Sequence, residues 1–281
     1  MSNNTLAMIC LVIGFLSNSA CVAANRSLTL EKDGLVGEYY SSNSNKPPVL
    51  VLGGSEGGIP TKLAQPMIDA NYPTLALAYF KHDGLPSELE EIPLEYFFTG
   101  KEWLLKQVHN KYDQLIIVGW SKGAEAALLL ASRSSEVMQV IAIAPSSVAW
   151  AGILNDWQKV PSSSWTEKQH ALPHVAFNPS GPVTGLLDLY QQSLDNRQDD
   201  GAADIPVQNI SAKVALMTGE NDEIWPSSSM AAYICQQMNQ NEHNTCQHFN
   251  YLNHDHLLNY EFLDTAYPSG QDFMRILTST D

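Results

Sequence analysis

Residues 115–131 read LIIVGWSKGAEAALLLA: an apolar run of strand length, a Gly-x-Ser-x-Gly turn and an apolar helix. In a turn of this kind the serine adopts a strained backbone that projects its Oγ into solvent. The flanking Gly119 and Gly123 lack the Cβ atoms that would collide with the neighbouring strand and helix. The pattern therefore predicts a nucleophile at Ser121. The alternative is an ordinary glycine-rich turn between a strand and a helix.

Further apolar runs of strand length lie on both sides of that turn, separated by segments with helical periodicity. The runs are 49–52, 74–79, 115–118, 140–144, 214–217 and 248–252, and the helical segments are 61–70, 94–108, 122–133 and 227–238. Short apolar strands alternating with helices are typical of a mostly parallel central sheet with helices on both faces. The expected fold class is therefore α/β. Proline before a hydroxyl residue marks two helix starts, with Thr61 and Ser227 as expected caps.

Two segments depart from the alternation. Residues 28–40 alternate in polarity and contain glycines, which predicts an antiparallel hairpin at the sheet edge. Residues 146–210 form a long polar insertion, which we interpret as a lid, with a solvated decoration as the alternative. Its aromatic residues could wall an apolar acyl pocket or only fasten the insertion to the body: Trp150, Trp157, Trp165, Phe177 and Tyr190.

The charge of the chain argues against several partners. Its 281 residues include 15 Lys plus Arg against 30 Asp plus Glu, a formal net charge of -15. This charge repels phosphate backbones and anionic lipid headgroups, so we expect neither nucleic-acid binding nor electrostatic membrane docking. No apolar stretch beyond residue 24 is long enough to span a bilayer.

Residues 1–24 are expected to be a signal peptide, followed by one domain over residues 25–281. They contain no charged side chain, and residues 6–16 form an apolar run too short to span a bilayer. Small residues at 23 and 24 permit cleavage, which would place the protein in the periplasm or outside the cell. The alternatives are a retained, buried N-terminal helix and a lipoprotein acylated at Cys21, which would put the protein on a membrane.

Cys235 and Cys246 are the cysteines that remain after such cleavage. An oxidising compartment favours a disulfide between them. Their spacing says nothing about geometry, so two free thiols are an equal alternative.

A serine hydroxyl needs a base to take its proton and a carboxylate to orient that base. In hydrolases built on such sheets the acid and then the histidine follow the serine along the chain. Asp222 lies in the loop after the strand at 214–217, at the edge where catalytic groups collect in open α/β sheets. We choose it over Glu220 and Glu223 for its distance beyond the strand.

His256 is the expected base. It directly precedes an apolar pair that can anchor its loop, which favours it over His254. The His254-Asp255-His256 run also suggests a metal site, but such a pair supplies two ligands, and no further His or Cys cluster completes a zinc set. We therefore expect neither a metal nor an organic cofactor.

The tetrahedral intermediate of acyl transfer needs N–H donors for its oxyanion. The backbone N–H of Lys122, directly after the nucleophile, is expected to supply one. The second is expected from the glycine-rich loop 53–58, with Ser55 as first choice and Glu56 as second. A phosphate cradle is the rival interpretation of this loop, although the loop lacks the Lys-Ser/Thr ending of a P-loop and nothing basic surrounds it.

Separated motifs along the chain resemble one family. They are VLVLGGSEGGIP at 49–60, LALAYF at 75–80, IPLEY at 92–96, GWSKGAE at 119–125 and DEIWPSS at 222–228. Together they resemble the C-terminal catalytic domain shared by acyl-CoA thioesterases and bile acid-CoA:amino acid N-acyltransferases, an α/β-hydrolase related to dienelactone hydrolase. The resemblance implies Ser121 as nucleophile, Asp222 as acid and His256 as base. With serine at position 121 the chain resembles the hydrolase branch of the family, because the nucleophile of the acyltransferase branch is a cysteine.

The chain also departs from that family. Its closing helix is expected to be short, at 272–277. CoA is a cytosolic cofactor with several phosphate charges, a poor match for an exported protein of net charge -15. The thioester specificity of the family is therefore not carried over.

We expect an exported serine hydrolase that cleaves a small-molecule carboxylic ester or thioester through an acyl-enzyme on Ser121. The first alternative is a cytoplasmic acyl-CoA thioesterase or acyltransferase. The second is a non-catalytic binding module on a hydrolase scaffold, because a fold alone does not guarantee turnover.

Overall fold

Strand pairing builds one large sheet in the computed structural model, which describes residues 25–108, 111–240 and 245–279. Its strands, in spatial order, are β1 (Asn25–Leu28), β2 (Val36–Tyr40), β4 (Thr74–Ala78), β3 (Val49–Leu52), β6 (Leu115–Trp120), β7 (Val137–Ile143), β10 (Lys213–Gly219) and β11 (Cys246–Tyr251). Neighbours from β4 to β11 run parallel, whereas β2 is antiparallel to both β1 and β4. The expected α/β class with a mostly parallel sheet is confirmed.

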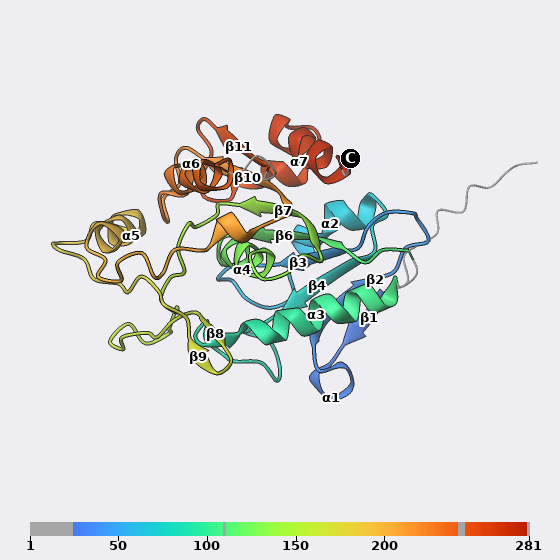
Figure 1. Cartoon of the computed structure of the whole chain (residues 1–281), viewed down its shortest axis with the longest axis horizontal. Helices are drawn as coiled ribbons and strands as arrows, with labels where there is room; N and C mark the ends of the chain where they lie inside the picture. The colour runs from blue at the N-terminus through green and yellow to red at the C-terminus, as the bar shows by residue number, and fades with distance from the viewer. Residues whose placement is uncertain (1–24, 109–110, 241–244, 280–281) are drawn as a thin grey trace, which may run out of the picture.

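Helices cover both faces of this sheet, as expected (Figure 1). They are α2 (Thr61–Asp69), α3 (Leu94–Gln107), α4 (Lys122–Ala131), α6 (Ser227–Met238) and α7 (Pro268–Thr278). Successive side chains of a strand point to opposite faces. Leu50 and Leu52 of β3 therefore pack in one cluster with α3, α4 and α6, and Val49 and Val51 pack in the other with α2 and α7.

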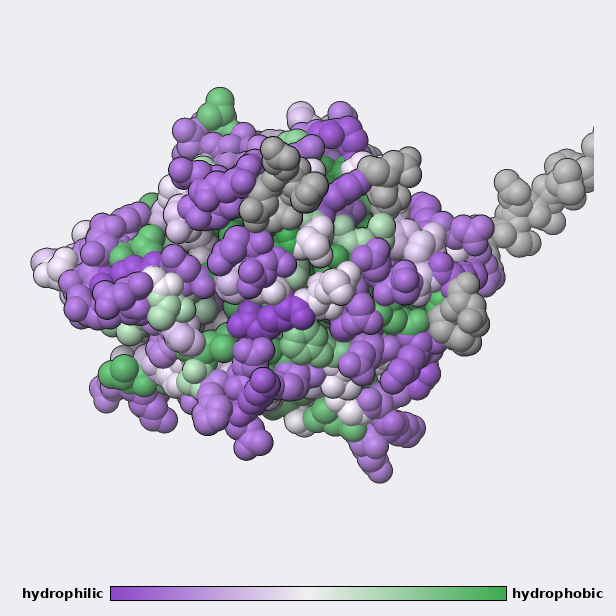
Figure 2. Space-filling model, viewed as in Figure 1, coloured by the Kyte–Doolittle hydropathy of each residue, from purple (hydrophilic) through white to green (hydrophobic). Residues whose placement is uncertain are grey.

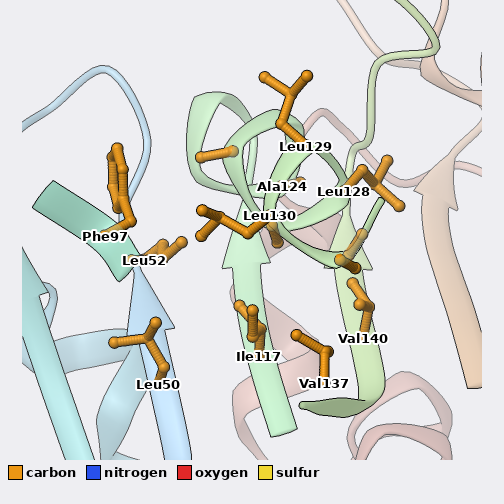
Figure 3. Packing of buried hydrophobic residues seen from close by; sticks show 14 of the residues in the cluster. Leu50, Leu52, Phe97, Ile117, Ala124, Leu128, Leu129, Leu130, Val137 and Val140 are labelled. Carbon is orange, nitrogen blue, oxygen red and sulfur yellow. The ribbon is translucent and has the colours of Figure 1, made fainter. Parts of the chain in front are cut away.

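Helix α4 is buried along its whole length. Figure 3 shows its Leu128 and Leu130 close to Ile117 of β6 and Val140 of β7. A helix that is apolar all round is a core helix. The Gly-x-Ser-x-Gly turn is therefore held between a central strand and a helix that is packed on all sides.

The predicted edge hairpin is present, with one correction. β1 and β2 pair antiparallel at the edge of the sheet. Leu30 and Lys32, expected in a strand, lie instead in the short helix α1 (Leu30–Asp33). Gly34 ends this helix in the left-handed conformation (φ 68°), which glycine adopts at no steric cost.

The prediction that Thr61 and Ser227 cap their helices is wrong. Both are the first helical residues, and Pro60 and Pro226 stand at the cap positions without a side-chain hydrogen bond. The hydroxyl of Ser227 is used elsewhere, as described below.

The closing helix α7 is longer than the expected 272–277. Pro268 begins it, at a position where the missing N–H of proline costs nothing. Phe273, Ile276 and Leu277 then bury one side of the helix against the α2 face of the sheet.

The insertion 146–210 separates β7 from β10 and contains little regular structure. It carries α5 (Leu186–Asp195), the 3-10 turn η1 (Val207–Asn209), and strands β8 (Trp165–Glu167) and β9 (His170–Ala171), which form a small sheet with β5 (Ile92–Pro93). Figure 1 shows α5 at the left of the molecule, away from α2 and α7.

Cys235 of α6 and Cys246 of β11 form a disulfide. Of the two states that the sequence leaves open, the structure has the bonded one. The bond ties α6 to the last strand of the sheet.

The face seen in Figure 2 is largely hydrophilic, in keeping with the net charge of -15. Over the described ranges, none of the helices combines the length and the apolar character that crossing a bilayer requires.

Candidate active site

Ser121 lies at the turn between β6 and α4 with φ 52° and ψ -121°, a conformation that few non-glycine residues adopt. A Cβ atom at Gly119 would lie 2.3 Å from the carbonyl oxygen of Gly123, and one at Gly123 would lie 2.2 Å from that of Leu52. Both distances are far below van der Waals contact. Gly119 and Gly123 therefore let α4 begin directly against the end of β3, which is the strained turn that the sequence predicts.

Asp222 and His256 meet Ser121 at this turn. His256 Nε2 lies 2.9 Å from Ser121 Oγ, and His256 Nδ1 lies 2.8 Å from both carboxylate oxygens of Asp222. The close packing of the β10 end brings them together, since a Cβ atom at Gly219 would lie 2.1 Å from the carbonyl oxygen of Asp255. Side chains from three distant segments thus form one continuous hydrogen-bonded chain.

The Asp222 carboxylate is buried and fully engaged. Its Oδ1 accepts the backbone N–H groups of Ile224 (2.8 Å) and Trp225 (3.2 Å), and its Oδ2 accepts the hydroxyl of Ser227 (2.5 Å). The Trp225 ring also meets the His256 ring edge to face, with centroids 5.0 Å apart. These contacts fix the carboxylate and the imidazole in one orientation.

The competing candidates lie elsewhere. Glu220 and Glu223 are exposed. His254 Nδ1 faces the carbonyl oxygen of Leu252 (2.8 Å) and its Nε2 faces Glu261 (2.9 Å). Partial burial opposes protonation of His254, but these two hydrogen bonds outweigh it and raise its pKa. In the described residues, no group of three or more His, Cys, Asp or Glu side chains is arranged to hold a metal ion.

The loop 53–58 packs against the nucleophile, since a Cβ atom at Gly54 would lie 3.1 Å from Ser121 Cβ. Tyr79 Oη donates to the carbonyl oxygen of Gly53 (2.6 Å), and the N–H of Gly57 donates to that of Gly54 (3.3 Å). In a trans peptide the C=O of one residue and the N–H of the next point in opposite directions. Fixing the Gly54 carbonyl therefore also fixes the direction of the Ser55 N–H.

The N–H groups of Ser55 and Lys122, the two predicted oxyanion donors, have no acceptor among the described residues. The N–H of Glu56, the second choice, likewise has no acceptor among the described residues, whereas the Glu56 carboxylate is engaged. Its Oε1 accepts the N–H of Gly54 (2.9 Å) and the indole N–H of Trp120 (2.6 Å), which ties the loop to the turn. The sequence did not single out Tyr79 or the Glu56 carboxylate.

Glu125 and Lys122 form an ion pair with no solvent exposure beneath the site, with Nζ 2.6 Å from Oε2. Glu125 Oε1 also accepts the backbone N–H of Trp150 (3.0 Å) and the indole N–H of Trp165 (2.6 Å). Burial lowers the pKa of Lys122, and the neighbouring Glu125 carboxylate partly offsets this. One carboxylate thus anchors the insertion to the helix that begins after the nucleophile.

A pocket of about 510 Å³ opens above Ser121 and His256. Its wall includes Trp157, Phe177 and Tyr190, three of the aromatic residues proposed for it. Trp150 and Trp165 do not line it. They are fully buried and, through Glu125, fasten the insertion to the body. The two interpretations of the aromatic residues therefore each hold for part of the set.

A more open hollow of about 880 Å³ lies beside α6. Its lining includes Asp188, Asp222 and Glu223 but neither Ser121 nor His256. It therefore gives no access to the nucleophile.

Comparison with protein families matches residues 92–265 to the family described as "BAAT / Acyl-CoA thioester hydrolase C terminal". The chain belongs to this family. The match covers the turn at Ser121, the insertion, Asp222 and His256, whereas the loop 53–58 precedes it. The resemblance seen in the motifs is thereby confirmed.

Relatives within the BAAT / acyl-CoA thioester hydrolase family are distant. Acyl-coenzyme A amino acid N-acyltransferase 1 of Mus musculus is 26% identical over 80% of this chain and 51% of its own length. Mitochondrial acyl-coenzyme A thioesterase 2 of Homo sapiens is 24% identical over 68% of this chain and 38% of its own length. The chain spans about half, or less, of the curated relatives it matches.

Solved structures show that this family member has the α/β-hydrolase fold. An esterase of Pyrococcus furiosus superposes with a TM-score of 0.56 at 12% identity, covering 86% of this chain and 87% of that one. The monoacylglycerol lipase of Paleococcus ferrophilus gives 0.55 at 15% identity, covering 88% and 98%. At such identities the likeness concerns the fold alone.

The buried ion pair gives a stability prediction. Glu125→Ala leaves the Lys122 ammonium buried without its partner and removes the acceptor of two Trp N–H groups, so we expect a loss of about 3–5 kcal/mol in the free energy of unfolding. Arg275→Ala is the matched control, because Arg275 and Asp272 are also three residues apart but their side chains are exposed and half-buried, respectively. It should lose less than about 1 kcal/mol. Denaturant unfolding measures both, and equal losses would contradict the anchoring role of Glu125.

Proposed function

We propose that this protein is a serine hydrolase that cleaves a carboxylic ester, or a thioester, through an acyl-enzyme on Ser121. The observation that carries the proposal is the His256 ring, which bridges Ser121 Oγ and the Asp222 carboxylate. That is the geometry in which a histidine can act as a general base and an acid can hold its tautomer.

In the first half-reaction, Ser121 Oγ attacks the carbonyl carbon of the substrate while His256 Nε2 takes the hydroxyl proton. Asp222 accepts the N–H of His256 Nδ1 and stabilises the imidazolium that forms. The N–H groups of Ser55 and Lys122 stabilise the oxyanion. Collapse of the tetrahedral intermediate breaks the bond to the leaving group, which receives the proton from His256. Water then attacks the acyl-enzyme by the same route and releases the acid.

An ester is favoured over an acyl-CoA by the charges around the pocket. Its lining holds one cation, Lys159, against the carboxylates of Glu56 and Asp156. Together with the net charge of -15, this surface repels the phosphates of CoA. The matched relatives are named for acyl-CoA substrates, so an acyl-CoA thioesterase or acyltransferase is the second candidate.

We further propose export, with cleavage after Ala23 or Ala24. Residues 1–24 lie outside the described residues, so the support comes from the sequence and from the Cys235–Cys246 disulfide. Disulfides of this kind persist in oxidising compartments.

Removal of the nucleophile or the base should abolish turnover. Ser121→Ala and His256→Ala should each lower kcat on a nitrophenyl ester by about 10³-fold or more, because triad members act as a unit. His254→Gln is the matched control and should keep its activity. A fluorophosphonate should label Ser121 in the unsubstituted protein and nothing in Ser121→Ala. A folded protein without this adduct would support the non-catalytic binding module instead.

Tyr79→Phe tests the role of the loop 53–58. Without the hydrogen bond to Gly53, about 1 kcal/mol of loop orientation is lost, so kcat should fall about five- to tenfold while KM changes little. Tyr96→Phe is the control, because the Tyr96 hydroxyl bonds backbone groups of Val36 and Ala78 away from the site. Tyr96→Phe should lower the free energy of unfolding and leave kcat unchanged. A purely structural role of Tyr79 would leave both variants with the same kcat.

Substrate and compartment are tested together. On matched series of nitrophenyl esters and acyl-CoAs of graded chain length, we expect kcat/KM at least about tenfold higher on the esters, since each repelled phosphate weakens binding. The amino terminus of the exported protein should start at residue 24 or 25. Equal rates on both series, or a retained Met1, would favour the acyl-CoA candidate.

A further inference from the structure

Exposed apolar side chains gather at the mouth of the active-site pocket. The loop after β7 leaves the body at a narrow neck, where the N–H of Gly152 donates to the carbonyl oxygen of Ser162 (2.7 Å). Between these residues, Trp157 is 81% exposed and Val160 is 89% exposed, and both line the pocket. Among the described rings, Trp157 contacts none.

The start of α5 supplies the opposite side of the mouth. Leu186 lines the same pocket and is 41% exposed. Beside it, Val183 is 44% and Leu187 is 38% exposed, and neither of these lines the pocket of Ser121. We call Trp157, Val160, Val183, Leu186 and Leu187 the apolar rim.

The apolar rim is significant because it lies at a pocket. Single exposed apolar residues are common and need no explanation, but apolar residues grouped around a pocket mark an interaction site. Three rim residues, Trp157, Val160 and Leu186, line the pocket that has Ser121 in its wall, and Val183 and Leu187 are near neighbours of Leu186 in the chain. Whatever body carries the substrate to the nucleophile must therefore touch the rim.

We propose that the apolar rim docks on the surface of a neutral or zwitterionic lipid aggregate, which presents its acyl esters to the pocket. The inference rests on the proposed function, since a docked lipid surface is useful only if an acyl ester is the substrate. Trp157 suits the headgroup level of a membrane, where indole rings concentrate. The charges nearest the rim, on Asp156, Lys159 and Asp188, include no excess of cations. With a net charge of -15, attraction to anionic lipid is excluded as the driving force.

Trp157 provides a direct probe of docking. Of the six tryptophans of the chain, it is the exposed one, and the other five are buried or half-buried. In the non-hydrolysing Ser121→Ala variant, phosphatidylcholine vesicles should shift the tryptophan emission to the blue. Adding Trp157→Phe, which keeps an apolar ring, should remove the shift while sedimentation with the vesicles persists.

The rim residues outside the pocket test the surface itself. Val183→Ser combined with Leu187→Ser should weaken sedimentation with phosphatidylcholine vesicles by about tenfold, because two apolar side chains no longer enter the interface. Hydrolysis of a soluble short-chain nitrophenyl ester should be unchanged. Leu30→Ser is the matched control, an exposed leucine on α1, which Figure 1 shows far from α5. It should affect neither measurement.

Several results would overturn the proposal. No emission shift with phosphatidylcholine, association only with anionic vesicles and lost in salt, or unchanged binding of the double variant would each do so. A concentration-dependent dimer that the double variant abolishes would show that a second copy covers the rim. Vesicle binding without cleavage of the soluble ester would contradict the proposed function and leave docking intact. Cleavage of the soluble ester without vesicle binding would contradict docking alone.

Discussion

The positive φ of Ser121 is the constraint on which the site depends. A non-glycine residue in this region of φ/ψ space stores about 1–3 kcal/mol of strain and persists only where its surroundings over-determine it. Here the Ser121 N–H donates to the carbonyl oxygen of Ile143 on β7 (2.8 Å), and the Ser121 carbonyl oxygen accepts the N–H groups of Ala124 (2.9 Å) and Glu125 (3.1 Å). The apolar helix is buried on every side, so the strain cannot relax by moving it. This arrangement also sets the direction of the Lys122 N–H, because Lys122 directly follows Ser121. The loop 53–58 begins at the end of β3, next to the same turn.

The carboxylates around the site are the second constraint on it. The site is surrounded by carboxylates, which would oppose a developing oxyanion if they were free to point at it. Each instead has its own donors: Glu56 takes N–H groups of Gly54 and Trp120, Asp222 takes two backbone N–H groups and the Ser227 hydroxyl, and Glu125 takes Lys122 and two tryptophans. The N–H groups of Ser55 and Lys122 are left without an acceptor among the described residues. In the proposed mechanism this arrangement lets a protein of net charge -15 stabilise an oxyanion, because these carboxylates are already paired with their own donors.

Much of this arrangement could be predicted from sequence, because periodicity and chain order are local properties. The strands around Ser121 and the helix that follows it depend on apolar runs, and Asp222 and His256 stand after strands in the order that the topology requires. Tyr79 could not be found this way, since in an apolar run it is indistinguishable from a core residue until Gly53 is seen to approach its hydroxyl. The role of Ser227 was mispredicted for another reason: its hydroxyl was expected to cap α6, but it donates to Asp222, five residues earlier in the chain. Among the aromatic residues of the insertion, some line the pocket, whereas Trp150 and Trp165 bond Glu125 and anchor the insertion. This division could not be predicted, because Glu125 lies in another element.

The insertion has a fixed inner part and an outer part that walls the pocket. Its inner part is fixed, because Glu125 holds Trp150 and Trp165 from a position without solvent exposure. Its outer part, the loop around Trp157 and the start of α5, forms most of the pocket wall. The family match over residues 92–265 includes both the inner and the outer part of this insertion. The charge and polarity of the outer wall belong to the insertion, so substrate choice can change there without disturbing Ser121, His256 or Asp222.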